Sequence, residues 1–345
     1  MDIMNLLEKV KNKELSDLHL TVNSPPMVRR YVDLIPLDNQ ALSAQEIKNM
    51  IYSILSEWQK QHLEANKDLD FSFSPSSDSR FRVGTYQQRE ATEVVFRNIL
   101  PYIYNMNELG LPQIITDLCQ LNDGIVIIGG ATGSSKSTTI SLMIDIINKT
   151  KGGATLSLEK PIEYMHRNVK AIVKQKEVGV DVTSFAAGLK ASLRQDADVI
   201  IVGEIFDSDS IEAAIATAET GHLVIISLHS TDSVQVFERI LSFFPSEQRH
   251  YICNRLSHSL KAVIVQELLP HKSGTKRVLA TEVCTVNTAV KRIIRNEEFT
   301  QLPSIIQTSS QYKMHSMQKS LDMLFESGFI SSDTYEIYST KSFKQ

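Results

Sequence analysis

The sequence predicts an α/β protein with two domains, and its length and a change in strand pattern are the observations behind this prediction. The chain has 345 residues, whereas a common domain has roughly 100–150. Up to about residue 100, apolar and polar residues alternate as in an antiparallel sheet. After Pro101 the expected strands are uniformly apolar, as in a mainly parallel sheet covered on both faces. We therefore expect a small domain over 1–100 and a larger one over 101–345.

The first domain is expected to contain a largely antiparallel sheet and one helix. A capping-box pattern at Ser43 and Glu46 starts a run of apolar residues at helical spacing that continues to about Leu63, which makes Trp58 a core residue. Alternating residues predict a strand pair over 18–37 and further strands at 69–73, 80–86 and 92–97.

The second domain is expected to alternate buried strands with helices. A short helix is predicted around 111–121, and a second one over 139–148. From about Pro245 the pattern is mostly helical. Buried strands are predicted at 125–128, 154–158, 199–202 and 223–227.

The composition excludes several classes of protein. With 42% hydrophobic and 22% charged residues, the chain is neither disordered nor of low complexity. Its net charge of −4 provides no global positive field for nucleic acid or anionic lipid. Cys119, Cys253 and Cys284 are widely spaced and odd in number, which indicates reduced thiols in a cytosolic protein. No apolar run reaches the roughly 18 residues that a membrane span requires.

A phosphate-binding loop is predicted after the strand at 124–128. The loop reads GGATGSSKST over 129–138 and runs directly into a helix, which is the context that a P-loop requires. Its glycines allow backbone N–H groups to face phosphate oxygens, the Lys136 ammonium suits the β and γ phosphates, and the Ser137 hydroxyl can ligate Mg²⁺. A nucleoside triphosphate and Mg²⁺ are the ligands that this loop predicts. The candidate nucleotide-binding residues of the loop are Gly130, Ala131, Thr132, Gly133, Ser134, Ser135, Lys136, Ser137 and Thr138.

One residue of this loop departs from the motif. The pattern GxxxxGK[ST] has glycine before the lysine, whereas this chain has Ser135. A side chain there crowds the phosphates or strains the turn, at a cost of about 1–3 kcal/mol if the backbone is in a sparsely populated conformation.

Two acidic positions complete a nucleoside triphosphatase pattern. Glu204 ends the apolar strand that follows Asp198, where a carboxylate can hold a magnesium-bound water. Glu159 and Glu163 follow the strand at 154–158, and either carboxylate could polarise the attacking water; we select Glu163.

Two histidines bracket another apolar strand. His222 and His229 stand at the two ends of the strand at 223–227. Taken alone, histidines at such positions are more often hydrogen-bonded structural groups than sensors.

Ordered motifs relate the chain to a known family. Together they cover about Ser16 to Ile330, and the chain resembles the secretion NTPases, in particular the PilT/PilU-type type IV pilus retraction ATPases. The motifs are SDLHL (16–20), DFSF (70–73), RFRV (80–83), VFR (95–97), the P-loop, PIEY (161–164), SLRQDADVIIVGE (192–204), AETGHLV (218–224), SLHS (227–230) and a degenerate AVKRIIR (289–295).

The resemblance implies a PAS-like N-terminal domain, a RecA-like ATPase domain with C-terminal helices, and a homohexamer. In such rings Glu163 and Glu204 serve water and magnesium, with Ser137 as the metal ligand. Arg82 and Arg97 match arginines thought to reach a γ-phosphate as arginine fingers, a role that suits a rigid guanidinium. His222 and His229 match a histidine box that reports nucleotide state.

The resemblance also implies a mechanical function. Such motors hydrolyse ATP to power pilus retraction and twitching motility. They act in the cytoplasm, peripherally at the inner membrane, on a pilus platform protein and possibly beside a paralogous pilus ATPase. No nucleic acid partner is expected.

Three departures from the family pattern leave an alternative open. Ser135 replaces glycine, Lys160 replaces the aspartate of an EDPIE box, and Phe206 replaces an arginine. The alternative is a hydrolytically weak ATP-binding ring subunit that acts as a scaffold or accessory to another motor. A pilus-extension or type II secretion ATPase is disfavoured because the chain lacks a four-cysteine module. A nucleic-acid motor is disfavoured because the chain lacks a basic, aromatic-rich groove.

Overall fold

The computed structural model describes residues 2–11, 15–30, 33–76, 79–99 and 105–343, and the chain divides into two compact units. The N-terminal unit comprises Met1–Tyr102 together with Pro161–Met165, and the C-terminal unit comprises Ile103–Lys160 and His166–Gln345. The domain boundary predicted between residues 100 and 101 lies outside the described residues.

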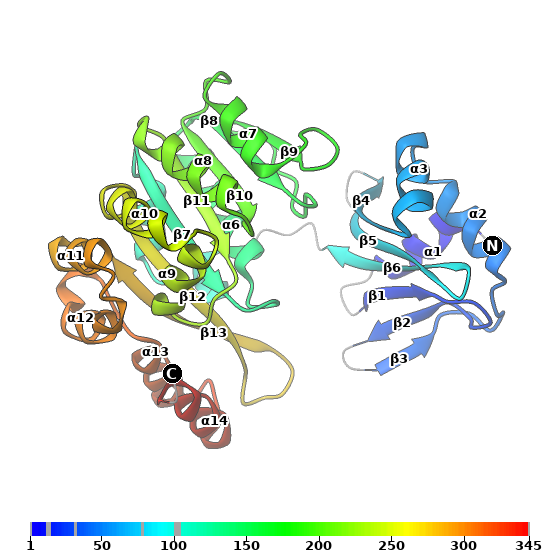
Figure 1. The fold of residues 1–345 in the computed structure, drawn as a ribbon. Helices are drawn as coiled ribbons and strands as arrows, with labels where there is room; N and C mark the ends of the chain where they lie inside the picture. The colour runs from blue at the N-terminus through cyan, green and yellow to red at the C-terminus, as the bar shows by residue number, and fades with distance from the viewer. Residues whose placement is uncertain (1, 12–14, 31–32, 77–78, 100–104, 344–345) are drawn as a thin grey trace. The chain divides into compact units, whose positions relative to one another are not determined.

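The N-terminal unit is built on an antiparallel sheet of six strands in the order β3-β2-β1-β6-β5-β4 (Figure 1). Alternation along the strands sends Phe71, Phe81 and Phe96 into a core to which all three helices contribute. The strands are β1 (Leu15–Leu20), β2 (Met27–Arg30), β3 (Asp33–Pro36), β4 (Asp68–Ser76), β5 (Ser79–Gln88) and β6 (Ala91–Ile99). The helices are α1 (Ile3–Val10), α2 (Ala44–Tyr52) and α3 (Glu57–Asn66).

The helical part of this unit differs from the prediction. Ser43 and Glu46 form the predicted capping box, but the single helix expected up to Leu63 is two helices, because Ser56 and Gln59 form a second capping box. Trp58 lies in the first turn of α3 and is 50% exposed, so its assignment to the core was wrong. Helix α1 was not predicted, although its apolar residues have helical spacing.

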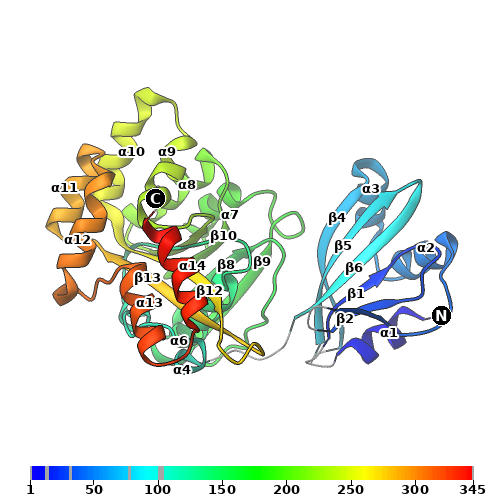
Figure 2. The ribbon, with the colours of Figure 1, turned by 90° about the horizontal axis from the view of Figure 1, so that it is seen from below.

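The C-terminal unit is built on seven strands in the order β13-β12-β7-β11-β10-β8-β9, seen from a second direction in Figure 2. All neighbouring pairs are parallel except β12 and β13. The strands are β7 (Gly124–Gly130), β8 (Gly153–Glu159), β9 (Ala171–Glu177), β10 (Val199–Glu204), β11 (Leu223–Leu228), β12 (Leu260–Pro270) and β13 (Arg277–Thr285).

Helices cover both faces of this sheet. On one face Val126 and Ile201 pack with Ile144 of α6, and on the other Ile127 and Ile200 pack with Ile211 of α8. This confirms the covered, mainly parallel sheet and the α/β fold class. The helices are α4 (Met106–Leu109), α5 (Ile114–Cys119), α6 (Lys136–Thr150), α7 (Phe185–Ser192), α8 (Ser208–Glu219), α9 (Ser233–Ser242), α10 (Ser246–Ser259), α11 (Thr288–Asn296), α12 (Leu302–Thr308), α13 (Met317–Glu326) and α14 (Ser332–Phe343), with short 3₁₀ turns at Phe299–Gln301 and Ser310–Tyr312.

Three strands of the sheet were not predicted. β12 and β13 interrupt the region after Pro245 that was expected to be mostly helical, although helices α10 to α14 do follow there. β9 is an edge strand with alternating exposure along its length. The thiols of Cys119, Cys253 and Cys284 are free and buried. Within the described ranges, no helix is both long and apolar enough to cross a membrane.

Candidate functional site

The candidate phosphate site lies where β7 passes through a loop into α6. β7 is buried along its whole length and is paired in parallel with β11 and β12. The carboxyl ends of parallel strands form the edge of an α/β sheet at which ligands are usually bound. The loop 131–135 lies at this edge, and the backbone N–H groups at the start of α6 supply the positive end of a helix dipole.

Close packing under the loop explains the two glycines that begin it. A side chain at Gly129 would place its Cβ 2.7 Å from the Ser230 hydroxyl oxygen. Gly130 has φ 151°, and a Cβ there would lie 2.2 Å from the Ser134 hydroxyl oxygen and 2.7 Å from the Gln266 carbonyl. A side chain at Gly129 would displace neighbouring side chains, and one at Gly130 would also press on the backbone of Gln266, so glycine fits best at both positions.

Lys136 is folded onto the loop that precedes it. Its Nζ donates to the carbonyl oxygens of Gly130 at 2.7 Å and Ala131 at 3.1 Å. Burial lowers the pKa of the Lys136 ammonium, and the Glu204 carboxylate partly opposes that shift. Two carbonyl oxygens and one carboxylate thus hold the Lys136 ammonium at the loop. A bound anion could replace these contacts.

Glu204 lies at the end of β10, opposite Lys136. Its Oε1 is 3.8 Å from Lys136 Nζ, and this oxygen is buried without a hydrogen-bond partner. The pairing of β10 with β11 is irregular between Val202 and Glu204, and such an irregularity re-aims the following side chain. An unsatisfied buried carboxylate oxygen at this edge has the capacity to accept from a water molecule.

Ser135 has the backbone conformation that its position in the motif predicts for glycine. Its φ of 69° and ψ of 26° are left-handed, and it immediately precedes α6. Its side chain makes no capping hydrogen bond to the helix. Serine therefore carries a local strain here that nothing in its own side-chain contacts offsets.

The two histidines lie at opposite ends of β11. His229 follows the strand, and its Nε2 is 3.4 Å from the Thr132 hydroxyl of the loop. His222 precedes the strand, where its Nδ1 contacts the Thr217 carbonyl at 3.1 Å and the Thr220 hydroxyl at 3.0 Å. Only His229 is thus brought to the phosphate loop.

Two residues at this edge were missed in the sequence. Gln266 on β12 is 1% exposed, pairs in register with Gly130, and donates from Nε2 to Thr139 of α6 at 2.7 Å. Ser230 packs against Gly129. A polar residue inside the apolar run of β12 was the available signal for Gln266, but that run was not recognised as a strand.

The carboxylates after β8 have separate surroundings. Glu159 lies in the C-terminal unit, and its Oε1 accepts from the Ser157 hydroxyl at 2.6 Å and from Gln175 Nε2 at 3.0 Å. Glu163 lies in the segment 161–165 that belongs to the N-terminal unit. The side chains of Lys160 and Phe206, which replace family residues, are both exposed.

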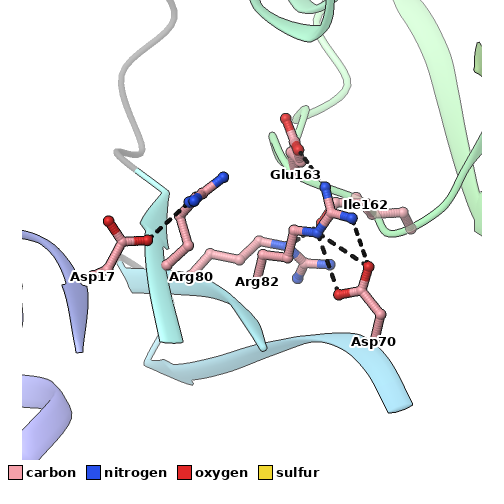
Figure 3. A network of polar contacts seen from close by, with 7 residues as sticks. Asp17, Asp70, Arg80, Arg82, Ile162 and Glu163 are labelled. Atoms are coloured by element: carbon pink, nitrogen blue, oxygen red, sulfur yellow. Dashed lines mark hydrogen bonds and ion pairs between the residues drawn. The ribbon is translucent and has the colours of Figure 1, made fainter. Parts of the chain in front are cut away.

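Arg82 and Glu163 are brought together in the N-terminal unit (Figure 3). Arg82 Nη1 is 3.6 Å from Glu163 Oε1, and its Nη2 is 2.6 Å from Asp70 Oδ2. Arg82 Nε lies 3.2 Å from each oxygen of Asp70, which gives a fork-shaped contact between the guanidinium and that carboxylate. Both predicted residues are therefore in one ion-pair network with a carboxylate that was not predicted.

Arg97 is held differently on the same sheet. Its Nε donates to Asp17 at 2.9 Å, and its side chain remains 67% exposed while that of Asp17 is 8% exposed. Burial raises the pKa of the Asp17 carboxyl, but hydrogen bonds from Ser16 and Arg97 and the charge of Arg97 outweigh it and lower the pKa overall. Asp17 thus anchors the base of an otherwise exposed guanidinium.

The chemistry of the loop suits Mg²⁺ bound together with a nucleotide. No group of three or more His, Cys, Asp and Glu side chains suited to a metal occurs in the part of the chain that the structure describes. Mg²⁺ retains several waters and takes few protein ligands beside substrate phosphates. The exposed Ser137 hydroxyl and the unpartnered oxygen of Glu204 match such a sparse donor set.

Comparison with known proteins places this fold in a family. Residues 2–322 match the Type II/IV secretion system protein family. A type IV pilus retraction ATPase, PilT, from Pseudomonas aeruginosa is 36% identical over 331 residues, which cover 96% of this chain and 96% of that protein. The type IV pilus ATPase PilU of the same organism is 35% identical, covering 97% of this chain and 87% of that protein.

A solved structure agrees with these relatives. The crystal structure of the pilus retraction motor PilT with bound ADP has a TM-score of 0.88 and 37% identity, and the match covers 97% of this chain and 96% of that chain. The likeness therefore extends over both units, and that relative binds the nucleotide product of ATP hydrolysis.

Proposed function

Because the chain belongs to the Type II/IV secretion system protein family, we propose that it is an ATP-hydrolysing motor that powers pilus retraction. The observation that carries the proposal is the 3.8 Å contact between Lys136 of the P-loop and Glu204 at the end of β10. It occurs in a chain that is similar over nearly its whole length to a pilus retraction ATPase. ATP is the proposed substrate, and ADP with phosphate the products.

The phosphate loop has two tasks in this proposal. Lys136 exchanges its contacts with the Gly130 and Ala131 carbonyls for phosphate oxygens, to which it donates N–H bonds. The backbone N–H groups of the loop and of the first turn of α6 orient the same phosphates. Mg²⁺, when bound beside Ser137, supplies positive charge that neutralises the phosphates during transfer.

The carboxylates have a different task. Glu204 accepts a hydrogen bond from water through its unpartnered Oε1 and holds that water beside the phosphate site. We propose Glu163 as the residue that polarises the attacking water, and Arg82 and Arg97 as guanidiniums that stabilise charge on the transferred phosphoryl group. His229 contacts the loop through Thr132 and is proposed to respond to the nucleotide. His222 is proposed to respond with it from the other end of the strand.

The assembly and the location are also proposals. We propose that residues 1–100 form a PAS-like domain, that residues 101–345 form a RecA-like ATPase domain with C-terminal helices, and that the chain forms a homohexamer. Its proposed partners are an inner-membrane pilus platform protein and a paralogous pilus ATPase, since PilT and PilU coexist in one organism among the relatives. The proposed location is the cytoplasm, peripheral to the inner membrane.

Steady-state Mg–ATP hydrolysis by the purified oligomer tests the enzyme. Lys136→Ala and Glu204→Gln should each lower turnover by about 100-fold or more, the scale of a lost catalytic group. Lys149→Ala and Glu212→Gln are matched controls, because both side chains are exposed on the outer surface of α6 and α8. Equal turnover in Glu204→Gln and the wild-type protein would contradict the assignment of Glu204.

Measuring ATP binding separately from ATP hydrolysis distinguishes an active motor from a scaffold subunit. The alternative, a hydrolytically weak ring subunit, is favoured specifically by the strained Ser135 of the loop. Tight binding of a fluorescent ATP analogue without hydrolysis by the wild-type protein would support that alternative. Binding with turnover that Glu204→Gln removes would support the motor.

A further inference from the structure

Arg80 joins the N-terminal sheet to the segment that bears Glu163, and we propose that it is a positioning residue for that carboxylate. The inference rests on the proposed role of Glu163 in ATP hydrolysis. It assigns a role in the reaction to a residue that does not need to touch nucleotide, water or magnesium.

Register places the polar residues of this unit on one face of the sheet. Across four strands Ser72 of β4 pairs with Arg82 of β5, Arg82 with Arg97 of β6, and Arg97 with Asp17 of β1. Directly paired residues point to the same face. Arg80 is two residues before Arg82 on β5, and so its side chain belongs to this face as well.

The Arg80 guanidinium makes three hydrogen bonds that join β4 to the segment. Its Nε donates to the Ile162 carbonyl at 2.7 Å, while Nη1 donates to the Ser74 hydroxyl at 3.1 Å and Nη2 to the Ser72 hydroxyl. The two serines of β4 thus hold the Nη atoms, while Nε is directed at the segment. Figure 3 shows Arg80 and Ile162 in this network. A charged donor on a carbonyl makes a stronger hydrogen bond than a neutral donor does.

The segment 161–165 is well suited to being held at the Ile162 carbonyl. Pro161 restricts its own backbone φ, and Ile162 is only 8% exposed. Loss of this bond would leave a partly buried carbonyl without its charged donor, at a cost in free energy. The bond from Arg80 therefore constrains the residue immediately before Glu163, and the position of the Glu163 carboxylate depends on it.

The three arginines of the face consequently have different roles. Arg97 is mostly exposed and held at Nε alone by Asp17, and Arg82 pairs with two carboxylates. Arg80 donates to the main chain of the segment 161–165. These bonds of Arg80 reach neutral oxygens of Ile162, Ser72 and Ser74, as suits an anchor of the segment.

Kinetics of Arg80→Gln test the proposal, with Arg89→Gln as the matched control because Arg89 is exposed at the β5–β6 turn. Arg80→Gln should lower kcat by about 10- to 100-fold, the scale of a displaced catalytic group, and leave KM for ATP unchanged. In a Glu163→Gln background the same change should have little further effect, because the group that it positions is already lost. Arg80→Lys should recover part of kcat, since its ammonium can still donate to the carbonyl.

Hydrogen–deuterium exchange of the nucleotide-free protein supplies a readout that does not depend on hydrolysis. Peptides covering 161–165 should exchange faster in Arg80→Gln than in the wild-type protein, and no faster in Arg89→Gln. If exchange over 161–165 responds as expected but the wild-type protein hydrolyses no ATP, Arg80 does fix the segment and the proposed function is wrong.

Two results would overturn the positioning role itself. A raised KM with unchanged kcat in Arg80→Gln would make Arg80 a nucleotide ligand. Unchanged exchange over 161–165, or a loss of kcat that adds in full to that of Glu163→Gln, would show that Arg80 does not act through this segment.

Discussion

Ser135 is the residue at which the phosphate loop departs from its motif, and its backbone angle φ sets the energetic cost of that departure. The sequence shows that serine replaces glycine at this position. It predicts a cost in free energy only if the backbone there has a left-handed conformation. The φ of 69° meets that condition. A residue with a Cβ pays about 1 kcal/mol or more for this conformation, and glycine does not.

Ser135→Gly is therefore expected to raise the free energy of unfolding by about 1 kcal/mol. If the chain is an effective motor, turnover should change little, because the loop already binds phosphate with serine in place. Lys67→Gly is the matched control, since Lys67 has φ 67° at the end of α3, in the other unit. Urea unfolding and ATPase assays on both variants check this.

Different turnover in the two variants would change the interpretation. A sharp rise in turnover in Ser135→Gly alone would mean that serine restrains hydrolysis, and would favour the accessory-subunit reading. A stability gain absent from Ser135→Gly but present in Lys67→Gly would show that the strain at Ser135 is offset by contacts of the loop.

The site role of a single residue could be predicted where a sequence motif defines its surroundings. It could not be predicted where the role depends on a contact with a residue distant in the sequence. Lys136 and Glu204 follow from the P-loop and from an acidic strand end, and they lie 3.8 Å apart. Asp70 has no motif of its own as an arginine partner, because its role follows from the β4–β5 register. Trp58 was misplaced because periodicity continued across a helix break that Ser56 creates.

At the scale of elements, His166 ties the start of the β8–β9 crossover to α6 and β9. Its main-chain N–H donates to the Gln175 side chain at 2.9 Å, and its Nε2 is 3.3 Å from the Ser141 hydroxyl. Burial lowers the pKa of His166 to about 4, although Asp145 opposes the shift. An unfolded histidine titrates near pH 6.5, which is roughly the model-peptide value.

The sign of the pH effect follows from these two values. Between pH 6.5 and 4 the unfolded state binds a proton that the folded state excludes, so stability is complete above this window and is lost as the pH falls through it. At pH 5 the loss is about 2 kcal/mol from this group. His166→Gln cannot titrate, and so it should lose less stability between pH 7 and 5 than the wild-type protein. Thermal unfolding at both pH values checks this, and equal losses in the two proteins would refute it.

Strands were predicted correctly where a short apolar run was bounded by turn residues. They were missed where the run had no such boundary or where the strand carries charged residues. β7, β10 and β11 are mostly apolar because helices cover both faces of the sheet. β12 is equally apolar but follows directly after the helix α10, so that the boundary between the two has no turn signal. β9 contains charged residues because it is an edge strand, and its pattern alone could not be told from a loop.

At the scale of the whole molecule, the hydrophobic cores separate by unit. One cluster lies entirely in the N-terminal unit, and the other two lie in the C-terminal unit, on the two faces of its sheet. Phe81 packs edge-on against Phe96 in the first, and Phe237 stacks on Phe299 in the second unit. Chains with separate cores commonly unfold in more than one step.

Calorimetry should therefore resolve two transitions that respond to different substitutions. Phe81→Ala should lower the stability of one transition by about 3–5 kcal/mol, and Phe237→Ala that of the other. Each variant is the control for its counterpart, because both remove a fully buried phenylalanine. A single transition shifted equally by both would contradict independent cores.

The strand β11 has a mechanical property that follows from its burial. All six of its residues are buried, and it is hydrogen-bonded to β7 on one side and β10 on the other. A displacement of the strand along its axis would break the hydrogen bonds to both neighbours at once, so β11 is held rigidly between them. From His222 to His229 it spans about 23 Å at the usual rise per residue. One fully buried strand thus joins His229, at the phosphate loop, to His222, in the hollow lined by Lys151 and Asp198 at the opposite edge of the sheet.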